Sequence, residues 1–524
     1  MKHLFAVKSL DRLVGDTEEP AHQLRRSLGV VQLTALGIGA IIGAGIFSSV
    51  GSAAAGGSEH LGAGPAIMVS FVLTAIACGF AALCYAEFAA MVPVSGSAYT
   101  YAYATLGELV AWIIGWDLIL EYAIGNVAVA VSWSGYFQEL IRGLGFAWPG
   151  WLGMDYRSAA QGAHQVAAAG AAGGDAAGLS AVVRQAAEVF NTAPRVAGVP
   201  VILDLPAFLI VAFITWVLVR GIRESAWLNS AMVGLKLAII AFFIIVGAFY
   251  VKPENWVPFA PNGFRGISSA AAIIFFAYIG FDAVSTAAEE TKNPQRDMPI
   301  AMIASLVICT VVYILVALVL TGLVKWTELG TAEPLATAFS TLGMHWVAGI
   351  ISLGAVFATT SVLVVFQLGQ PRIFFSMARD GLLPAWASKV HPKYRTPHVT
   401  TILTGAVVAT FATFLNINEV VELTNIGTLF AFVLVAIGVV VLRRTNPDRP
   451  RPFRTPLVPW VPLFAVIMCS YLMIQLPWVT WVRFIFWLAV GLLIYVAYGA
   501  RHSMLRARAN GRRPLDNPAE GGHR

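Results

Sequence analysis

The feature that most constrains the fold is a glycine-rich interruption within an apolar run long enough to cross a membrane. Residues 28–52 are mostly apolar, and the stretch Gly37–Gly45 reads GIGAIIGAG, with four glycines. A helix in lipid must satisfy its own backbone hydrogen bonds, yet each glycine weakens a helix by about 1 kcal/mol relative to alanine. The run therefore predicts a helix that unwinds near Ile42–Gly45 and frees backbone N–H and C=O groups. The same glycines would also suit a close packing face between two helices.

The composition places the chain among multi-span helical membrane proteins. Of its 524 residues, 58% are hydrophobic and 12% are charged, whereas ordinary globular chains are about 45–50% apolar and about 25% charged. One helical span needs about 20 apolar residues. We therefore predict an all-α integral membrane protein with twelve transmembrane helices, at 28–52, 63–91, 107–140, 204–222, 227–250, 266–290, 298–323, 344–376, 398–416, 421–442, 457–476 and 480–501.

The basic residues gather on one side of this arrangement. The richest segments are 372–395, 443–454 and the tail after Arg501, and the order of the predicted spans puts all three on the side of both termini. Lysine and arginine accumulate on the cytoplasmic side of membrane proteins. The chain is therefore predicted to be a multi-pass protein of the cell membrane with cytoplasmic N- and C-termini. The net charge of +6 does not indicate nucleic acid, because no basic groove with interleaved aromatic residues occurs.

Three segments outside the spans complete the organisation. Residues 1–27 form a polar cytoplasmic N-terminal segment, and 142–203 form a long extracellular loop. Within that loop, 159–178 is nearly all alanine and glycine with a few polar residues, too poor in large apolar side chains to pack a core, so we predict a flexible linker followed by a short helix around 180–190. The cytoplasmic tail 502–524 is predicted to be disordered.

Acidic residues near the cytoplasmic span ends are expected to form salt bridges, in the manner of charged span ends generally. The acids are Glu87, Glu289 and Glu290, and the expected partners are Arg223, Lys292 or Arg296.

No pattern in the sequence indicates a metal, a cofactor or an enzyme. The four cysteines, Cys78, Cys84, Cys309 and Cys469, fall within predicted spans, and no CxxC pair occurs. The histidines fall in loops, tails or span ends, and no HExxH, GxSxG or P-loop pattern is present. An integral-membrane enzyme would need a nucleophile or base near a pocket, so we predict no enzymatic activity.

A second interruption occurs five spans after the first. The span at 266–290 breaks at Ala277–Asp282, where Gly280 lies two residues before the acid. Matching interruptions in two halves of a chain are the best sequence indication of inverted repeats with a binding site between them. Helix packing explains one glycine-rich helix well, but it explains the paired positions less well. The pair therefore favours a transporter with two five-helix repeats, at 28–250 and 266–442.

Several stretches resemble the amino acid–polyamine–organocation (APC) superfamily, and more narrowly the bacterial relatives of the cationic amino acid transporters (CAT). They are GIGAIIGAGIF at 37–47, CYAEFAAMVPVSGSAY at 84–99, GELVAWIIGWDLILEY at 107–122, FAYIGFD at 276–282 with EETKNP at 289–294, and GQPR at 369–372 with MARDGLLP at 377–384. The resemblance implies a fold like that of the leucine transporter (LeuT), a 5+5 inverted repeat with broken helices 1 and 6. Two extra helices follow at 457–501. The loop at 142–203 is longer than we expect for bacterial members.

An amino acid brings a carboxylate and an ammonium to such a site. The carboxylate suits the N-terminal end of a half-helix, where free N–H groups and the positive dipole end converge. The ammonium suits carbonyl groups at half-helix C-terminal ends. The predicted substrate-binding residues are Ile42, Gly43, Ala44 and Gly45 in the first interruption, and Phe276, Ala277, Ile279 and Gly280 in the second. Phe276 could cover the substrate, although an aromatic residue in an apolar span often serves packing alone.

Lys236 is the sharpest single residue in the sequence. It lies near the centre of span 227–250, too deep for its side chain to reach water easily. Charged residues at this depth are costly and usually functional, and burial disfavours a charged amine. Proton-dependent relatives resemble this chain in placing a lysine amine where a sodium ion would bind. We expect Lys236 to couple transport to protons, the alternative being a static lysine that cross-links spans through carbonyl groups.

Four acids complete the predicted proton-coupling set: Asp117, Glu121, Asp282 and Glu108. Asp117 and Glu121 are four residues apart and share a helical face. Asp282 lies at the second interruption, and Glu108 matches a glutamate that matters for cationic substrates in the animal members of the resembling family. These acids could relay protons, pair with a cationic substrate side chain or fix helices to one another.

We therefore predict a secondary active permease that imports amino acids by alternating access. The expected transport is proton-coupled symport of cationic or small neutral amino acids. An amino acid exchanger remains open, and so does a transporter-fold nutrient sensor, although the short tails argue against a sensor. The expected partners are an amino acid, protons and the lipid bilayer, and the chain is a monomer or a homodimer.

Overall fold

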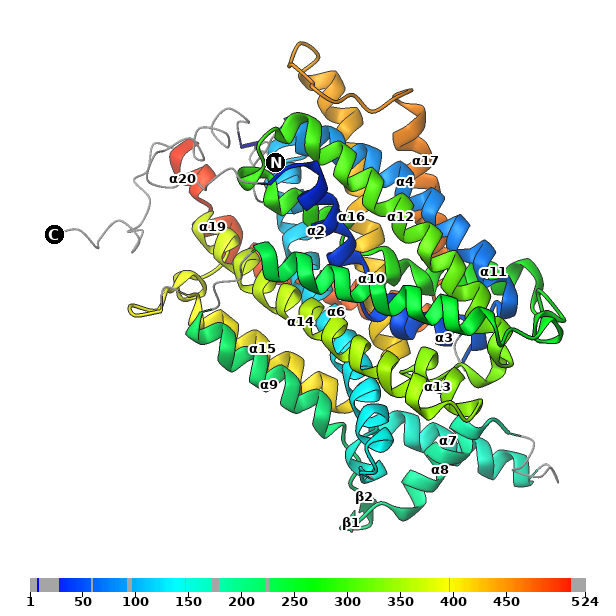
Figure 1. Ribbon diagram of the computed structural model, residues 1–524. Helices are drawn as coiled ribbons and strands as arrows, with labels where there is room; N and C mark the ends of the chain where they lie inside the picture. The colour runs from blue at the N-terminus through cyan, green and yellow to red at the C-terminus, as the bar shows by residue number, and fades with distance from the viewer. Residues whose placement is uncertain are drawn as a thin grey trace.

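The computed structural model describes residues 7–8, 28–57, 60–91, 97–146, 148–171, 179–221, 226–394 and 396–509, and these residues are almost entirely helical (Figure 1). The N-terminal segment predicted at 1–27 lies outside the description except for residues 7–8. So does the tail from residue 510. The prediction of an all-α protein is confirmed for the described part of the chain.

The helices of the first half are α2 (Val30–Ile41), α3 (Val50–Ala55), α4 (Ile67–Met91), α5 (Ser97–Thr105), α6 (Glu108–Gly143), α7 (Tyr156–Ala171), α8 (Ala181–Thr192), α9 (Leu205–Arg220) and α10 (Ala226–Ala248). Those of the second half are α11 (Gly263–Ile274), α12 (Pro294–Leu323), α13 (Pro334–Thr341), α14 (His345–Arg379), α15 (His398–Phe414), α16 (Ile417–Thr445), α17 (Trp460–Ile474), α18 (Trp478–Ile494), α19 (Ala500–His502) and α20 (Met504–Ala509). A two-residue antiparallel pair, β1 (Arg195–Val196) with β2 (Val199–Pro200), follows α8.

Within the described residues, 7 helices are long and apolar enough to cross a membrane, and the bent pair formed by α2 and the segment Gly45–Ala55 raises this to 8. Four shorter apolar helices, Leu205–Arg220, Gly263–Tyr278, His398–Phe414 and Trp460–Ile474, coincide with the remaining predicted spans. The boundaries agree with the predicted ones to within about five residues, except that the apolar helix Gly263–Tyr278 ends well before residue 290, the predicted end of that span. The count of twelve spans and the inverted repeat stay predictions.

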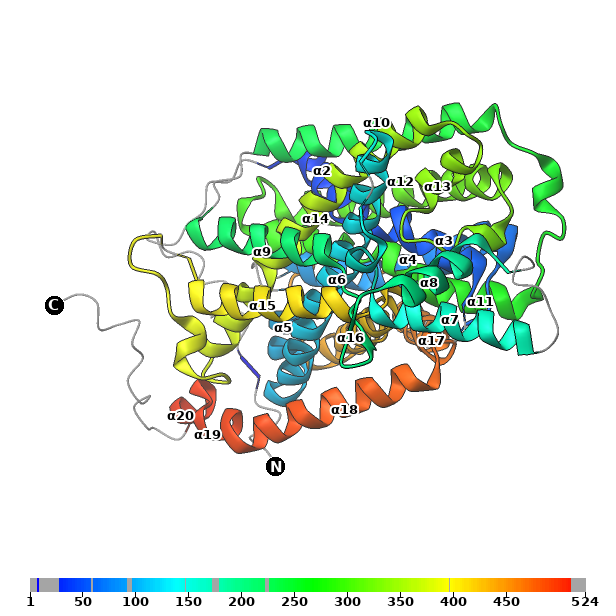
Figure 2. The ribbon, with the colours of Figure 1, turned by 90° about the horizontal axis from the view of Figure 1, so that it is seen from below.

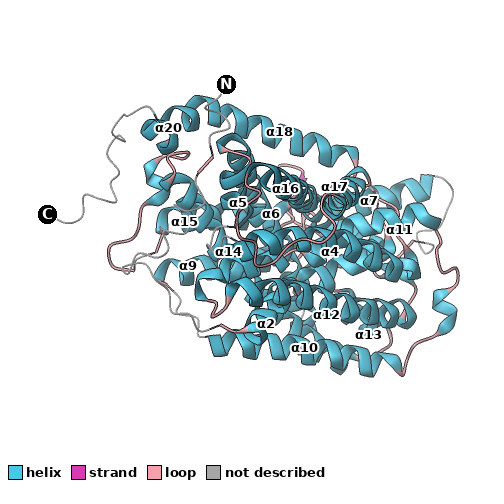
Figure 3. Ribbon diagram, turned by 90° about the horizontal axis from the view of Figure 1, so that it is seen from above, coloured by secondary structure: helices cyan, strands magenta, loops and turns pink. Residues whose placement is uncertain are grey.

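The helices pack around α6, the longest of them (Figure 2). Seen from below and from above the view of Figure 1, α10 and α18 lie at opposite edges of the bundle, with α6 between them (Figures 2 and 3). Helices α19 and α20 lie at one end of the bundle, which we call the terminal face (Figure 1). The helices α7, α8 and α13 lie at the other end, which we call the loop face.

The loop at 142–203 is more ordered than predicted. Residues 156–171 form α7, and α7 packs on α8, the short helix that was predicted around 180–190. The flexible-linker prediction is therefore wrong for residues 159–171, and residues 172–178 lie outside the description. Alanine and glycine suit close contact between two helices, and the Cβ atom that glycine lacks at Gly162 would lie 2.5 Å from the Ala186 Cβ. Small side chains here permit packing rather than preventing it.

Side chains at the ends of neighbouring spans hold this loop in place. Arg157 of α7 pairs with Glu419 at the start of α16, at 2.5 Å. Gln138 of α6 donates to the Gly153 carbonyl, at 2.9 Å. Asp204, the N-cap of α9, accepts hydrogen bonds from the Ala207 N–H and from the Ser134 hydroxyl. The loop is thereby tied to the ends of α6, α9 and α16.

Glu87 makes a different salt bridge from the one predicted. It is buried in α4 and accepts two hydrogen bonds from Arg443 of α16, each at 2.8 Å. Arg451 lies 3.3 Å away, and the Thr455 N–H donates at 2.8 Å. The expected pairing of Glu87 with Arg223, Lys292 or Arg296 is therefore wrong, because the chain after α16 folds back across the end of α4. Arg223 and the Glu289 side chain lie outside the described residues.

Candidate functional site

The first interruption lies where the sequence predicts it. Helix α2 ends at Ile41, Ile42 is extended with ψ 99°, and helical backbone resumes at Gly45. The two halves are bent by 42°. The first N–H groups of a helix have no partner within it, so the start of the second half leaves N–H donors free near Ala44 and Gly45. The unwinding predicted at Ile42–Gly45 is confirmed.

The second interruption falls within the predicted range. Helix α11 continues into the short helix Phe275–Tyr278, Ile279 is extended with ψ 132°, and Gly280 has φ +118°. A further short helix, Phe281–Glu290, begins after it. Left-handed backbone of this kind favours glycine, and a Cβ at Gly280 would also lie 2.8 Å from the carbonyl carbon and oxygen of Ala40. Gly280 therefore permits both the left-handed turn and the close approach of this segment to Ala40 of α2.

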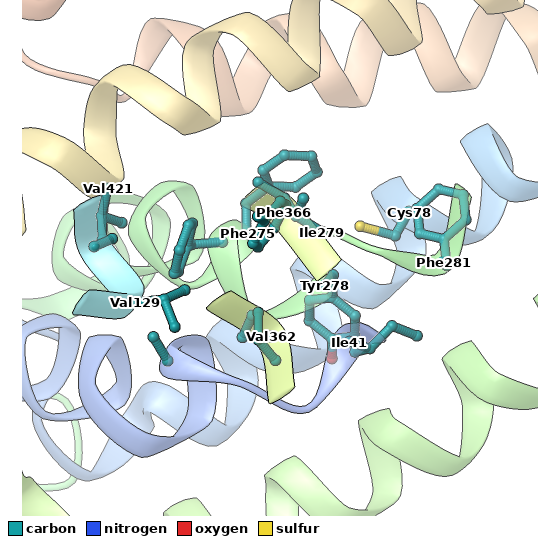
Figure 4. Packing of buried hydrophobic residues seen from close by; sticks show 14 of the residues in the cluster. Ile41, Cys78, Val129, Phe275, Tyr278, Ile279, Phe281, Val362, Phe366 and Val421 are labelled. Carbon is teal, nitrogen blue, oxygen red and sulfur yellow. The ribbon is translucent and has the colours of Figure 1, made fainter. Parts of the chain in front are cut away.

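The two interruptions touch each other. A Cβ built on Gly45 would lie 2.2 Å from the Cα of Ala277, closer than real Cβ contacts permit. At the other end of the contact, Gly280 lies against Ala40. Figure 4 shows side chains from both segments, Ile41 and Tyr278 among them, gathered in one buried apolar cluster. The predicted residues of the first and second interruptions are thus brought together in space.

Side chains from two neighbouring helices already form hydrogen bonds with part of the freed backbone. The Tyr313 hydroxyl of α12 lies 3.0 Å from the Ile41 oxygen and 2.9 Å from the Ala277 oxygen, one from each interruption. The Asn425 amide of α16 donates to the carbonyls of Ala272 and Ile273 at the end of α11, at 2.7 and 2.9 Å.

Of the carbonyls predicted to receive an ammonium, the one of Ala277 therefore already accepts a hydrogen bond. The Phe276 carbonyl accepts a long one from the Ile279 N–H, at 3.4 Å. Ile42 and Ile279 remain the better acceptors of the predicted set, since burying an ammonium requires acceptors that are not already used.

Lys236 is buried in α10, and its side chain reaches the first interruption. Its Nζ donates to the Gly39 carbonyl of α2 at 2.8 Å, two residues before the helix ends. The ion pairs found among the described residues do not include Lys236. A buried ammonium is costly unless it is paired with an acid or fully hydrogen-bonded. The amine is therefore placed where movement of α2 would change its surroundings directly.

Three of the four predicted acids form one cluster, which includes Asp282 at the second interruption. Glu121 interacts electrostatically with both Asp117 and Asp282, and it contacts the Thr428 hydroxyl. All three carboxyl groups are buried. Neither carboxyl oxygen of Asp117 has a hydrogen-bond partner among the described residues. This cluster joins α6 to the helix that follows the second interruption.

Glu108 does not join this cluster. It starts α6 at the terminal face, 17 residues before Gly125, which is about 25 Å at 1.5 Å per helical residue. Its buried carboxylate accepts a hydrogen bond from Tyr495 at 2.9 Å, and Arg506 of α20 lies 2.9 Å away. Ser503 also donates to it. The structure therefore places Glu108 in a network that holds the C-terminal segment, away from the interruptions.

That network corrects a second expectation. Residues 504–509, predicted as part of a disordered tail that starts at 502, form α20 and pack against the start of α6. No local pattern predicts this helix, because an arginine that pairs with a buried acid far away in the chain resembles any other basic tail residue.

The side chains around the interruptions are mainly apolar. A Cβ at Gly125 of α6 would lie 3.6 to 3.9 Å from Thr424, Phe366 and Phe276, which come from three different helices. Gly43 faces Val362 of α14 at 3.0 Å. The predicted covering residue Phe276 is therefore part of an apolar wall next to the freed backbone.

Sequence reasoning missed Tyr313 and Asn425. Both are polar side chains deep in apolar helices, and intramembrane polar groups generally need a stated partner. That signal could have singled them out, but their partners are backbone carbonyls exposed by interruptions elsewhere in the chain. Which carbonyls they meet follows from the fold alone.

Comparison with known proteins decides the class. The family model described as "Amino acid permease" matches residues 28–497, nearly the whole described chain. The chain belongs to the amino acid permease family. The resemblance to the APC superfamily is therefore confirmed, and the absence of enzymatic motifs agrees with a family of permeases.

Curated relatives of this permease are transporters with different printed substrates. It is 47% identical over 503 residues to the branched-chain amino acid permease BcaP of Bacillus subtilis (strain 168), covering 96% of this chain and 99% of that protein. It is 45% identical over 505 residues to the methylthioribose transporter of the same organism, covering 96% and 100%. It is 36% identical over 454 residues to the vacuolar cationic amino acid transporter 4 of Arabidopsis thaliana, covering 86% and 68%.

Proposed function

We propose that this permease is a proton-coupled importer of neutral amino acids with small or branched apolar side chains. The terminal face is the cytoplasmic one and the loop face is external, in keeping with the basic residues near the termini. The two interruptions form the substrate site. Transport proceeds by alternating access around them, as in other proteins whose broken helices hold the substrate.

The observation that carries this proposal is the contact between the two interruptions. The N–H groups left free near Ala44 and Gly45 lie beside the interrupted backbone around Ile279, because Gly45 contacts Ala277. Helix N-termini bind carboxylates, and helix C-termini attract cations. A zwitterion fits this arrangement, whereas a lone anion or a lone cation satisfies half of it.

The apolar wall supports a neutral side chain. Phe276, Phe366 and Val362 border the freed backbone, and burying a cationic side chain against them without an acid would be costly. The name of the BcaP relative points the same way. Glu121 and Asp282 support a second candidate, a cationic amino acid. Glu121 lies one helical turn before Gly125, which faces this wall, and Asp282 lies two residues after Gly280.

Lys236 supports proton coupling. Its amine contacts the Gly39 carbonyl at the first interruption, so its protonation changes the charge beside the helix that must move. Asp117, buried and unpartnered among the described side chains, is the second candidate for a proton, since burial costs a neutral acid far less than a carboxylate.

Uptake into proteoliposomes tests the proposal. We expect a pH gradient, acidic outside, to drive accumulation of leucine, isoleucine, valine or alanine above the internal equilibrium level, and we expect arginine and methylthioribose to be taken up at least tenfold less well. Counterflow without net accumulation on the gradient would identify an exchanger instead. Preferred uptake of arginine or lysine would establish the cationic candidate, and preferred uptake of methylthioribose would contradict an amino acid substrate.

A further inference from the structure

The loop face carries a short helix that closes over the first broken span. Helix α13 packs against α3, against α14 and against the segment Gly45–Ser49 that begins the second half of the first span. The Leu329 carbonyl and Pro334 lie so close to Gly51 of α3 that a Cβ there would have no room. The Ser48 hydroxyl donates to the Ala332 carbonyl. In this structure α13 therefore covers the loop-face end of the first broken span.

One carboxyl group lies under that cover. Glu333 is the N-cap residue of α13 and is partly buried. A Cβ on Gly135 of α6 would lie 2.4 Å from its Oε2 and 3.4 Å from its Cδ. Glycine at 135 thus gives the carboxyl group room to lie directly on the α6 backbone when α13 is in place.

A second carboxylate, that of Glu139, lies on α6 one helical turn after Gly135. Glu139 is held by Arg142 at 2.6 Å and by the Ser340 hydroxyl of α13, also at 2.6 Å. Arg142, the cation that also interacts with Glu333, is therefore already paired with Glu139, and its side chain is 61% exposed. The titratable and charged groups that interact with Glu333 from the elements around it are Tyr136, Glu139 and Arg142 of α6 and Asp204 before α9. His345 of α14 contacts Ser340 at the other end of α13.

We propose that Glu333 is an external proton-binding site, and that α13 closes over the first broken span when this carboxyl group takes up a proton. A charged Glu333 would be repelled by Glu139 and would lose part of its hydration where it lies on Gly135. The neutral acid escapes both costs. The proposal rests on the proposed external orientation of the loop face and adds a step that precedes substrate occlusion.

The direction of the pH dependence follows from the same contacts. Burial beside Glu139 raises the pKa of Glu333 from 4.5 to about 7 with α13 closed. With α13 open, the group is in water and has an ordinary pKa. Protonation of Glu333 therefore favours closure most strongly below about pH 4.5. This contribution to the closing equilibrium decreases as the pH rises toward 7, and above about pH 7 it no longer changes with pH. Each pKa unit of difference shifts the equilibrium about tenfold.

Thiol labelling from outside measures closure without any need for transport. Ser48→Cys places a thiol under α13, and Ser52→Cys on α3 is a second reporter if the first folds poorly. The native cysteines are all buried, so a membrane-impermeant maleimide should report on the introduced thiol. Because maleimide chemistry itself accelerates with pH, the measured quantity is the labelling rate with Glu333 divided by the rate with Glu333→Gln at each pH.

We expect this ratio to rise about tenfold or more between pH 5 and pH 7 and then to level off, while Glu254→Gln, an exposed external glutamate, leaves the pH profile unchanged. A ratio that stays constant with pH, or a Glu333→Gln profile identical to that of the native side chain, would overturn the proposal. If the labelling ratio does not change with pH but pH-driven uptake is intact, only the proposal for Glu333 is wrong. If the labelling ratio changes with pH as expected but pH-driven uptake is absent, only the proposal of proton-coupled transport is wrong.

Discussion

Replacing Lys236 with methionine is expected to lower the initial rate of substrate accumulation on a pH gradient at least a hundredfold. Methionine keeps most of the length and volume of the side chain, so the packing of α10 against α2 and α12 is preserved. What is lost is the hydrogen bond to the Gly39 carbonyl and the only group on α10 in that region able to carry a proton. Uptake into proteoliposomes with an imposed gradient measures the effect.

A matched control separates proton coupling from a general loss of charge. Lys252→Met removes an exposed lysine just beyond the same helix and should leave accumulation unchanged. Counterflow provides the second readout, because exchange of labelled for unlabelled amino acid needs a working site but no net proton movement. If Lys236→Met still concentrates substrate on the gradient, proton coupling through Lys236 is wrong. If it folds but neither binds nor exchanges substrate, Lys236 is a static cross-link.

Gly45→Ala is expected to weaken substrate binding by tenfold or more. The new Cβ would lie 2.2 Å from the Ala277 Cα, 2.7 Å from its Cβ and 2.8 Å from its nitrogen. None of these atoms is the flexible end of a side chain, so the two interruptions must move apart. Overpacking of this kind costs about 1–3 kcal/mol, and it falls on the segments that must face each other to hold both ends of a zwitterion.

The control for this change is Gly349→Ala in α14, where a Cβ would meet nothing within 4 Å. Alanine favours a helix over glycine by up to about 1 kcal/mol, so this control should retain binding and fold at least as stably as the native chain. Isothermal calorimetry in detergent gives both binding constants. Native-like affinity in Gly45→Ala would mean that the Gly45–Ala277 contact has no part in the site.

The sequence predicted the interruptions well because their cause is local. Gly43 and Gly45 weaken the helix where they stand, and Gly280 takes a left-handed turn that few other residues adopt. The depth of Lys236 could be read from the apolar residues on both sides. These features need no knowledge of the partners across the bundle.

What the sequence could not supply were contacts between distant segments. The Tyr313 hydroxyl of α12 donates a hydrogen bond to the Ala277 carbonyl, which is therefore no longer a free acceptor. Arg506 of α20 forms a salt bridge with Glu108. Both contacts form only because the fold brings α12 and α20 next to these residues. The composition of the Ala/Gly-rich residues in α7 predicts a flexible linker. The helix forms because it packs on α8, and no local pattern of large apolar side chains indicates that packing.

Competition by substrate fragments tests the backbone-held zwitterion most directly. Leucine, the matching amine without its carboxylate and the matching acid without its ammonium would each be used to displace bound radiolabelled leucine from the purified permease. We expect leucine to compete, and each fragment to compete at least a hundredfold less well, because each leaves one set of buried backbone groups without a partner. Equal competition by the amine or by the acid would contradict the claim that both interruptions hold the substrate.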